Sequence, residues 1–359
     1  MLRAIAICTI LFCIIIPVSG TIVTYIPDND SISSLDVMDI SESHDGIIAF
    51  ATTNGLSLFD SEWATIQAEP WEYDTGLQDN HIQTIEYDKY NSLWLGFSTG
   101  VQQYDGTAFT RVGTNEIFST MPIQDILRDN DTIWIANGNS GLNRLSGGKW
   151  EWIRPFADNG PGAYFITSMA KDHATGHIIL TTRLNGVWKG VSEGKEIQFS
   201  QIPIPEEISG KMTRVVDYPF GGVIVFNDNT ILYYSESGGI VPIIDCAALG
   251  YGVTRINDVA VTEEGVFVIG TNNGLYGYHT DEIIIHITRN TDEISNNEVT
   301  KVFSDSKGRW WFITNGEAGY YLSDDIPEKI PVTIADEYKP DNSYETGSAH
   351  PIQVPVHYV

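Results

Sequence analysis

One polar position recurs seven times along the chain, each time in the first apolar stretch of a repeated strand motif. Three of its members are carboxylic acids and two are cations. On a shared wall these groups suit the binding of a sugar, a small zwitterion or a metal ion. A second interpretation is that the wall is wet and each polar group needs a hydrogen-bonding partner. The seven candidate ligand-binding residues are Asp39, Thr84, Asp125, Ser168, Arg214, Asp258 and Lys301.

Other residues offer weaker chemistry. His173 and His177 lie four residues apart, a spacing that suits a metal on a helix, but here they flank a turn at Thr175-Gly176. Cys246 lies in the apolar stretch VPIIDCAAL and is predicted to be a buried residue rather than a nucleophile. The sequence contains no Ser-His-Asp order, phosphate-binding loop or Cys-His metal signature. We therefore predict no catalytic residue, no metal site and no cofactor.

The polar position belongs to a repeat of 41 to 45 residues. Each copy contains a first strand, a turn, an apolar strand, a small-residue turn and a Gly that opens a third strand, as in Ile82–Gly106 and Ile256–Thr280. This period, with short strands and no helical periodicity, predicts an all-β fold, a seven-bladed β-propeller of four-stranded antiparallel blades. The repeat is marked by Gly55, Gly100, Gly141, Gly186, Gly274 and Gly319, and by Asn229-Thr230 in the copy that lacks the Gly.

The first strand of each copy is predicted to line the central channel, which places the polar position on the channel wall. The second strands, such as LWLGFST and WWFITNG, are rich in branched and aromatic residues, as strands buried between neighbouring sheets require. The fifth copy, Met212–Tyr234, lacks the Trp and the Gly and is a degenerate blade. The first strands are predicted to begin at Val37, Ile82, Ile123, Ile166, Met212, Ile256 and Val299.

Closure of the ring is suggested by an internal similarity. The segment Thr24–Ile40 parallels His286–Val302, in which an outer strand leads into the next blade. By that analogy, Thr21–Pro27 is expected to be an N-terminal outer strand of the last blade, paired with Gly319–Leu322. A sheet shared by both ends of the propeller covers an edge that would otherwise be open to association. The segment Ile330–Ile334 fits the same place, so two closures remain open.

The two ends of the chain differ from the repeat. Residues 1–20 have a basic start, the apolar stretch Ala4–Ile16 and small residues before Gly20, which indicates a secretory signal peptide. An uncleaved N-terminal anchor is the alternative. We expect a propeller over 21–334 and a C-terminal tail over 335–359. The mature chain would then carry no membrane span and would lie outside the cytoplasmic membrane, secreted, at the cell surface or in the periplasm.

The charge limits the possible partners. The chain has 47 acidic and 20 basic residues, a formal net charge of -27. A surface this acidic repels phosphate backbones and anionic lipid headgroups, which excludes nucleic acid and membrane surfaces as expected partners. Neutral or cationic partners are favoured.

Several copies share a fuller motif, an aromatic or apolar strand followed by a small-residue turn and then Gly with Leu or Val. This motif resembles the two-component regulator propeller repeat, and the resemblance covers roughly the repeat region of the chain. It implies an extracytoplasmic ligand-sensing propeller. Such sensors usually continue into a membrane helix and a kinase or regulator module, and this chain stops, so a separate membrane signalling protein is implied as the partner. The matching residues are Leu93–Gly96 with Thr99–Val101, Ile133–Ala136 with Ser140–Leu142, Val268–Thr271 with Asn273–Leu275, and Asn54–Leu56.

Together these features favour an exported ligand-binding or sensor-type propeller over an enzyme. It would bind a small molecule, a glycan or a protein partner at its channel mouth or loop face, without its own signalling module. One alternative is a carbohydrate-active hydrolase or lyase that uses Asp39, Asp125 and Asp258, which requires carboxyl groups about 5 to 9 Å apart in one pocket. Another is a cell-surface structural or interaction protein. The candidate ligand-stacking aromatics, which break the register of the packing residues, are Trp71, Trp152 and Trp188.

Overall fold

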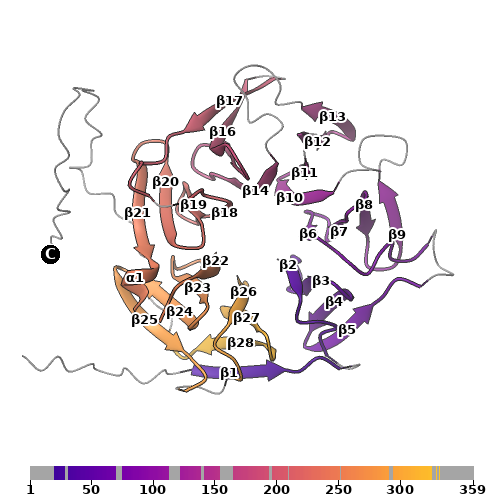
Figure 1. Cartoon of the computed structure of the whole chain (residues 1–359). Coiled ribbons are helices and arrows are strands. Elements are labelled where there is room, and N and C mark those ends of the chain that lie inside the picture. Colours follow the sequence, from indigo (N-terminus) through magenta and orange to yellow (C-terminus); the bar gives the residue numbers. More distant parts are fainter. Residues whose placement is uncertain are drawn as a thin grey trace, which may run out of the picture.

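Seven four-stranded antiparallel sheets stand around a central channel in the computed structural model of the chain (Figure 1). Each sheet is one blade, and the blades are numbered in the chain order of their innermost strands. The predicted all-β, seven-bladed propeller is confirmed. The structure describes residues 20–28, 31–69, 75–112, 122–138, 141–153, 165–193, 196–208, 210–250, 252–290, 294–325, 329 and 331.

The first four blades take their strands from consecutive stretches of the chain. Blade 1 contains β2 (Val37–Glu42), β3 (Ile48–Thr52), β4 (Gly55–Asp60) and β5 (Glu62–Ile66). Blade 2 contains β6 (Thr84–Tyr87), β7 (Leu93–Gly96), β8 (Val101–Tyr104) and β9 (Phe109–Val112). Blade 3 contains β10 (Ile123–Asp129), β11 (Thr132–Asn137), β12 (Leu142–Ser146) and β13 (Lys149–Ile153). Blade 4 contains β14 (Ile166–Lys171), β15 (Ile178–Thr182), β16 (Gly186–Glu193) and β17 (Glu196–Ile202).

The remaining blades include a short helix and a strand from the start of the chain. Blade 5 contains β18 (Arg214–Asp217), β19 (Val223–Phe226), β20 (Thr230–Ser235) and β21 (Gly239–Asp245), followed by α1 (Cys246–Leu249). Blade 6 contains β22 (Ile256–Val261), β23 (Phe267–Thr271), β24 (Gly274–His279) and β25 (Glu282–Ile287). Blade 7 contains β26 (Val299–Ser304), β27 (Arg309–Thr314), β28 (Ala318–Ser323) and β1 (Gly20–Tyr25).

The innermost strands carry a recurrent β-bulge. In blades 1, 3, 4, 6 and 7 the pairing with the second strand shifts register immediately before the polar position, for example between Val37 and Asp39 and between Ile256 and Asp258. In blades 2 and 5 the strand begins at the polar position itself, Thr84 and Arg214, two residues later than the sequence predicts. A bulge bends its strand and redirects the following side chains. The bulge therefore determines how the polar position points at the channel.

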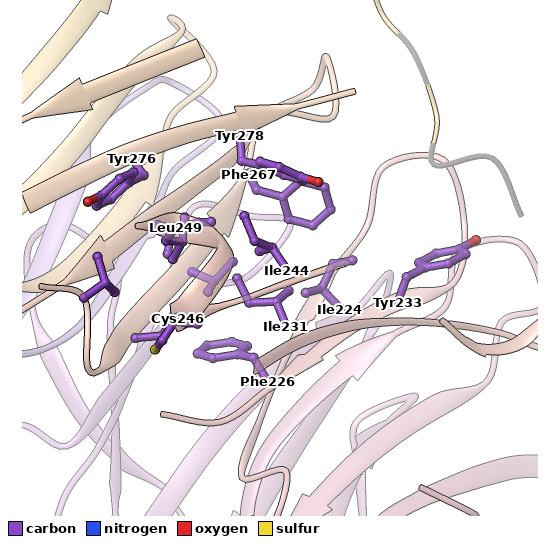
Figure 2. Close-up of a cluster of buried hydrophobic side chains, with 14 of the residues drawn as sticks. Ile224, Phe226, Ile231, Tyr233, Ile244, Cys246, Leu249, Phe267, Tyr276 and Tyr278 are labelled. Atoms are coloured by element: carbon purple, nitrogen blue, oxygen red, sulfur yellow. The ribbon is translucent and has the colours of Figure 1, made fainter. Parts of the chain in front are cut away.

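The core lies between the blades. The second strands of blades 1, 4 and 6 are buried along their whole length, as their branched and aromatic composition predicts. Figure 2 shows the cluster between blades 5 and 6, where Phe226 and Ile231 pack with Phe267 and with Leu249 of the short helix. Cys246 lies in the same cluster at 5% exposure, so the prediction that it is buried is confirmed.

The ring closes through the N-terminal strand. β1 pairs antiparallel with β28, with Thr21 opposite Leu322 and Thr24 opposite Gly319. This confirms the closure predicted for Thr21–Pro27, although the strand begins at Gly20 and ends at Tyr25. Gly319 is required by the contact, because a Cβ there would lie 2.5 Å from the carbonyl oxygen of Val23. The first and last strands of the propeller, β1 and β28, therefore lie side by side in one sheet, at the bottom of the view in Figure 1.

The predicted boundaries outside the propeller remain predictions. Residues 1–19 and the tail over 335–359 lie outside the described residues, as does most of the alternative closing segment Ile330–Ile334. Within the residues that the structure describes, no helix has the length and apolar character needed to cross a membrane.

Candidate functional site

The seven polar residues predicted from the repeat all lie on the innermost strands, which surround the channel (Figure 1). Each of the seven side chains contacts a neighbouring blade. The contacts are of three kinds: carboxylates that accept backbone N–H groups, hydroxyls that hydrogen-bond to the next or the preceding blade, and cations that flank a carboxylate. Their ligand-binding role stays a prediction, and the contacts show what else these residues do.

The three acidic members fasten each blade to the next. Asp39 accepts a hydrogen bond from the N–H of Ile85 at 2.9 Å, and Asp258 accepts one from the N–H of Val302 at 3.1 Å. Asp125 accepts the N–H of Met169 in the same way. In each case the donor belongs to the innermost strand of the following blade. A carboxylate that accepts backbone N–H groups makes a charge-assisted hydrogen bond, so these residues hold the ring together.

The hydroxyl members act in a similar way. Thr84 donates to Asp39 of the preceding blade at 2.8 Å, and Ser168 donates to the carbonyl oxygen of Val215 in the following blade at 3.0 Å. The bulge residue immediately before the polar position also reaches across, since Asn257 donates to the carbonyl oxygen of Val299 at 2.8 Å. These bonds agree with the interpretation that the channel wall is polar because its groups satisfy one another.

The channel wall of blades 1 to 3 is acidic. A third acidic residue lies there beside Asp39 and Asp125, namely Glu86 of β6, two residues after Thr84. Burial raises the pKa of Glu86 to about 8, and the negative charges of Asp39 and Asp217 add to the effect, while Arg128 and a hydrogen bond from Ser41 oppose it. The nearest charged partner is distant, with 3.8 Å between Arg128 Nε and Glu86 Oε1. Glu86 was not among the residues predicted, although the two-residue period of a strand places it on the same side as Thr84.

The two aspartates of this half have raised pKa values as well. Burial raises the pKa of Asp39, against the opposing charge of Lys301 and the N–H donors of Ile85 and Ile40. Burial also raises the pKa of Asp125 well above its usual value, and the charge of Asp39 raises it further. Burial therefore disfavours the charged form of both carboxyl groups in this half of the channel.

The channel wall of blades 5 to 7 has the opposite character. Asp258 is nearly buried and lies between two cations, with Arg214 Nη1 3.4 Å from Oδ1 and Lys301 Nζ 3.7 Å from Oδ2. A second guanidinium lies beside them, because Arg255 precedes β22 and donates to Asn257 Oδ1 at 2.7 Å and to Glu298 Oε1 at 2.5 Å. Arg255 and Glu298 escape the repeat alignment because they lie in the connection before the strand.

The three aspartates proposed for an enzyme lie on different blades. Asp39, on blade 1, and Asp125, on blade 3, share the acidic half, whereas Asp258, on blade 6, is flanked by two cations. A paired-acid mechanism that uses all three stays a prediction. Glu86 is the carboxyl group that accompanies Asp39 and Asp125 instead.

The other candidates separate in the structure. Trp188 is 7% exposed and donates its Nε1 hydrogen to the carbonyl oxygen of Asn185 at 3.0 Å, so it belongs to the core and is not open to a ligand. Trp152 lies on the outer strand β13 and is 38% exposed. Trp71 lies outside the described residues. His173 pairs with Asp217 at 3.1 Å, which raises the pKa of the imidazole.

A hollow lies away from the channel. It has a volume of about 410 Å³ and is lined by Ile243 and Ile283 of the outer strands of blades 5 and 6 and by Tyr278 of β24, together with Asp281 and Glu282. The Tyr278 hydroxyl donates to Asp281 at 3.1 Å on its border. No residue predicted from the repeat lines it, so the hollow and the channel are separate features.

Comparison with known proteins gives no match among protein-family models and none among curated proteins. Solved structures do match. The extracellular domain of BT4673 from B. thetaiotaomicron, described as a hybrid two component system, superposes with a TM-score of 0.64 at 21% identity over 84% of this chain. The corresponding domain of BT3049 from the same organism gives 0.67 at 15% identity over 87% of this chain. This chain spans 39% and 42% of those two chains.

A streptogramin B lyase is similar over almost its full length. It superposes with a TM-score of 0.66 at 13% identity, over 85% of this chain and 98% of the lyase. At these identities the likeness concerns the fold. The resemblance to the two-component regulator propeller repeat is thus confirmed by neighbours of the predicted kind, and the chain has the propeller fold of extracellular domains of two-component systems.

Proposed function

We propose that this protein is a ligand-binding propeller of the sensor type that takes a small polar molecule at the channel mouth of blades 5 to 7. The proposal rests chiefly on Arg214 and Arg255, whose side chains are 46% and 52% exposed at that mouth. Most other polar groups of the inner ring are used in bonds between blades. The two guanidinium groups are exposed, whereas the neighbouring polar groups of the innermost strands are mostly hydrogen-bonded between blades. A ligand at the mouth can therefore contact the guanidinium groups.

The likeness to extracellular domains of two-component systems supports the same function. In this proposal residues 1–20 direct export, residues 21–334 form the binding domain, and the protein acts outside the cytoplasmic membrane. A separate membrane signalling protein would read the ligand-bound state. Since loops at the channel mouth join different blades, a ligand there would alter the contacts between them.

The test is a thermal-shift screen of sugars and metabolites, followed by titration of each stabilising compound. Arg214→Gln is expected to abolish the shift, because it removes the guanidinium charge while the side chain stays polar and keeps Cβ, Cγ and Cδ. Arg183→Gln is the control, since Arg183 is an exposed arginine in the loop after β15, on blade 4 rather than on blades 5 to 7. A shift that survives Arg214→Gln would move the site elsewhere, and a screen in which no compound stabilises the protein would refute the proposed function.

One observation favours a second candidate, a hydrolase or lyase that uses the acidic half of the channel. Glu86, with its pKa near 8, would be protonated at neutral pH, and a protonated carboxyl group is what a general acid requires. The fold is shared with a streptogramin B lyase. Turnover of an oligosaccharide panel that is lost in Glu86→Gln would support this candidate. Turnover unchanged in that variant would remove Glu86 from it.

A further inference from the structure

The mouth of the channel at blades 5 to 7 is a local reversal of the charge of the chain. The chain carries a net charge of -27, yet among the described residues three cations there pair with two carboxylates, Asp258 and Glu298. The cations come from three successive blades. Arg214 begins β18, Arg255 directly precedes β22, and Lys301 is the third residue of β26. All three therefore lie at the N-terminal ends of innermost strands, where these strands enter the channel.

The two guanidiniums are arranged around one residue, Asn257. Its carbonyl oxygen accepts from Arg214 Nη1, and its side-chain Oδ1 accepts from Arg255 Nε at 2.7 Å. Its amide donates to Glu298 Oε1 at 2.9 Å and to the carbonyl oxygen of Val299 at 2.8 Å, which fixes the side chain in place. Asn257 is the bulge residue of β22, so the bulge itself sets the spacing of the two arginines.

Both arginines keep donors that no described residue uses. Arg214 hydrogen-bonds only through Nη1, and Arg255 only through Nε and Nη2, within the described residues. Arg214 also lies over the ring of Phe226, with 5.8 Å between the guanidinium carbon and the ring centroid, which holds its plane. A guanidinium presents a planar fork of donors that matches an oxyanion, and pre-organisation reduces the entropy lost on binding.

We propose that Arg214 and Arg255, positioned by Asn257, form a binding site for the oxyanion group of a small organic ligand. This inference rests on the proposed function and specifies the chemistry of its ligand, a carboxylate or a phosphate ester. The acidic exterior repels polyanions, so the ligand is small enough to reach the mouth as a single charged group. The carboxylate of Glu298 competes with the ligand's oxyanion for Arg255. If the side chain of residue 298 is made neutral, Asn257 still holds Arg255 in place through its Oδ1.

The test is isothermal titration with three matched sugars, glucuronate, glucose 6-phosphate and glucose. We expect the charged sugars to bind and glucose to bind at least about 10-fold more weakly, since a hydrogen bond to a charged group contributes about 1.5 to 3 kcal/mol, or about 10- to 100-fold in affinity. The two charged sugars distinguish a carboxylate from a phosphate site. Raising the salt concentration should weaken both.

Three variants separate the site from general damage to the fold. Arg255→Gln should weaken binding of the charged sugar about 10- to 100-fold, and Arg183→Gln should leave it unchanged. Glu298→Gln keeps the acceptor for Arg255 and removes the competing charge, so the charged sugar should bind more tightly, whereas mere damage would weaken it. If glucose bound with the same affinity as glucuronate, and this binding were lost in Arg214→Gln, the inference would be overturned and the proposed function would stand. Absence of binding by any of the three sugars, together with a negative thermal-shift screen, would refute both.

Discussion

Glu86 provides a measurable link between channel electrostatics and stability. In the folded chain its pKa is raised from 4.5 to about 8, chiefly by burial. Between these two values the folded state binds a proton that the unfolded state has released, so the free energy of unfolding falls as the pH rises through this window. At 1.36 kcal/mol per pKa unit the full rise corresponds to about 5 kcal/mol. Because the side chain keeps 27% of its exposure in a wet channel, we expect about 2 kcal/mol.

Glu86→Gln replaces the carboxyl group by a neutral amide that still accepts the hydrogen bond from Ser41. At pH 5 the variant and the parent protein should have similar stability, because both carry a neutral group at this position. At pH 9 the variant should be more stable by about 2 kcal/mol, since the parent must bury a charge there. The variant would thus lose the part of the decline in stability with rising pH that Glu86 causes.

The measurement is urea unfolding followed by tryptophan fluorescence at pH 5, 7 and 9, for which the chain contains nine tryptophans. Glu62→Gln is the control, because Glu62 lies exposed on the outer strand β5 and loses the same single charge. The control should show the same pH dependence as the parent protein. A difference between Glu86→Gln and the parent that stays constant from pH 5 to pH 9, or that favours the parent at pH 9, would refute the reasoning.

Three further changes test the bonds that hold blade 7. Asp305→Ala should destabilise the protein by about 3 to 5 kcal/mol in urea unfolding, because the buried carboxylate accepts four N–H donors, including Trp311 Nε1 at 2.8 Å. Gly319→Ala should cost about 1 to 3 kcal/mol and expose β1 to proteolysis, because the new methyl group would meet Val23. Glu42→Ala should lower the free energy of unfolding by about 1 kcal/mol, and with it the melting temperature, since it removes two hydrogen bonds between blades 7 and 1.

Controls for these changes are available in the chain. Asp60→Ala removes an exposed carboxylate at the end of β4 and should change stability by less than about 0.5 kcal/mol. Gly176→Ala adds a methyl group where nothing lies within 4 Å, so it isolates the cost of a positive φ from the cost of a clash. Gly319 has no positive φ, so a Gly319→Ala variant as stable as the parent protein would show that the close approach of the two terminal strands does not limit ring closure.

The fold was accessible from the sequence because each blade repeats the same local pattern. The Gly markers predicted the third strands, and the parallel between Thr24–Ile40 and His286–Val302 predicted that an N-terminal strand completes blade 7. Both inferences use local periodicity, which a single sequence contains. The β-bulge before the polar position was not predicted, because a bulge depends on the register with the neighbouring strand rather than on residue type.

The role of the polar position could be predicted only in part. Its place on the channel wall follows from the strand order, but the partners of Asp39 and Asp258 are backbone N–H groups 44 to 46 residues away, which a sequence does not mark. Glu86 could not be predicted from a single recurrent position in each strand. Arg255 could not be predicted because it lies in a connection between strands. Such residues become visible only when neighbouring blades are in contact.

These contacts separate construction from recognition. A carboxylate at the polar position can accept the N–H group of the following blade, so the repeated acids are explained by the assembly of the ring. Arg214 cannot accept that bond, and it donates instead to the carbonyl oxygen of Asn257 in the following blade. In blade 5, the copy that departs most from the repeat, the ring position therefore carries a cation with unused donors. Arg214 does not accept the N–H bond that joins neighbouring blades, and its charge is exposed. Ligand binding explains such a residue better than assembly of the ring does, and we therefore place the ligand beside blade 5.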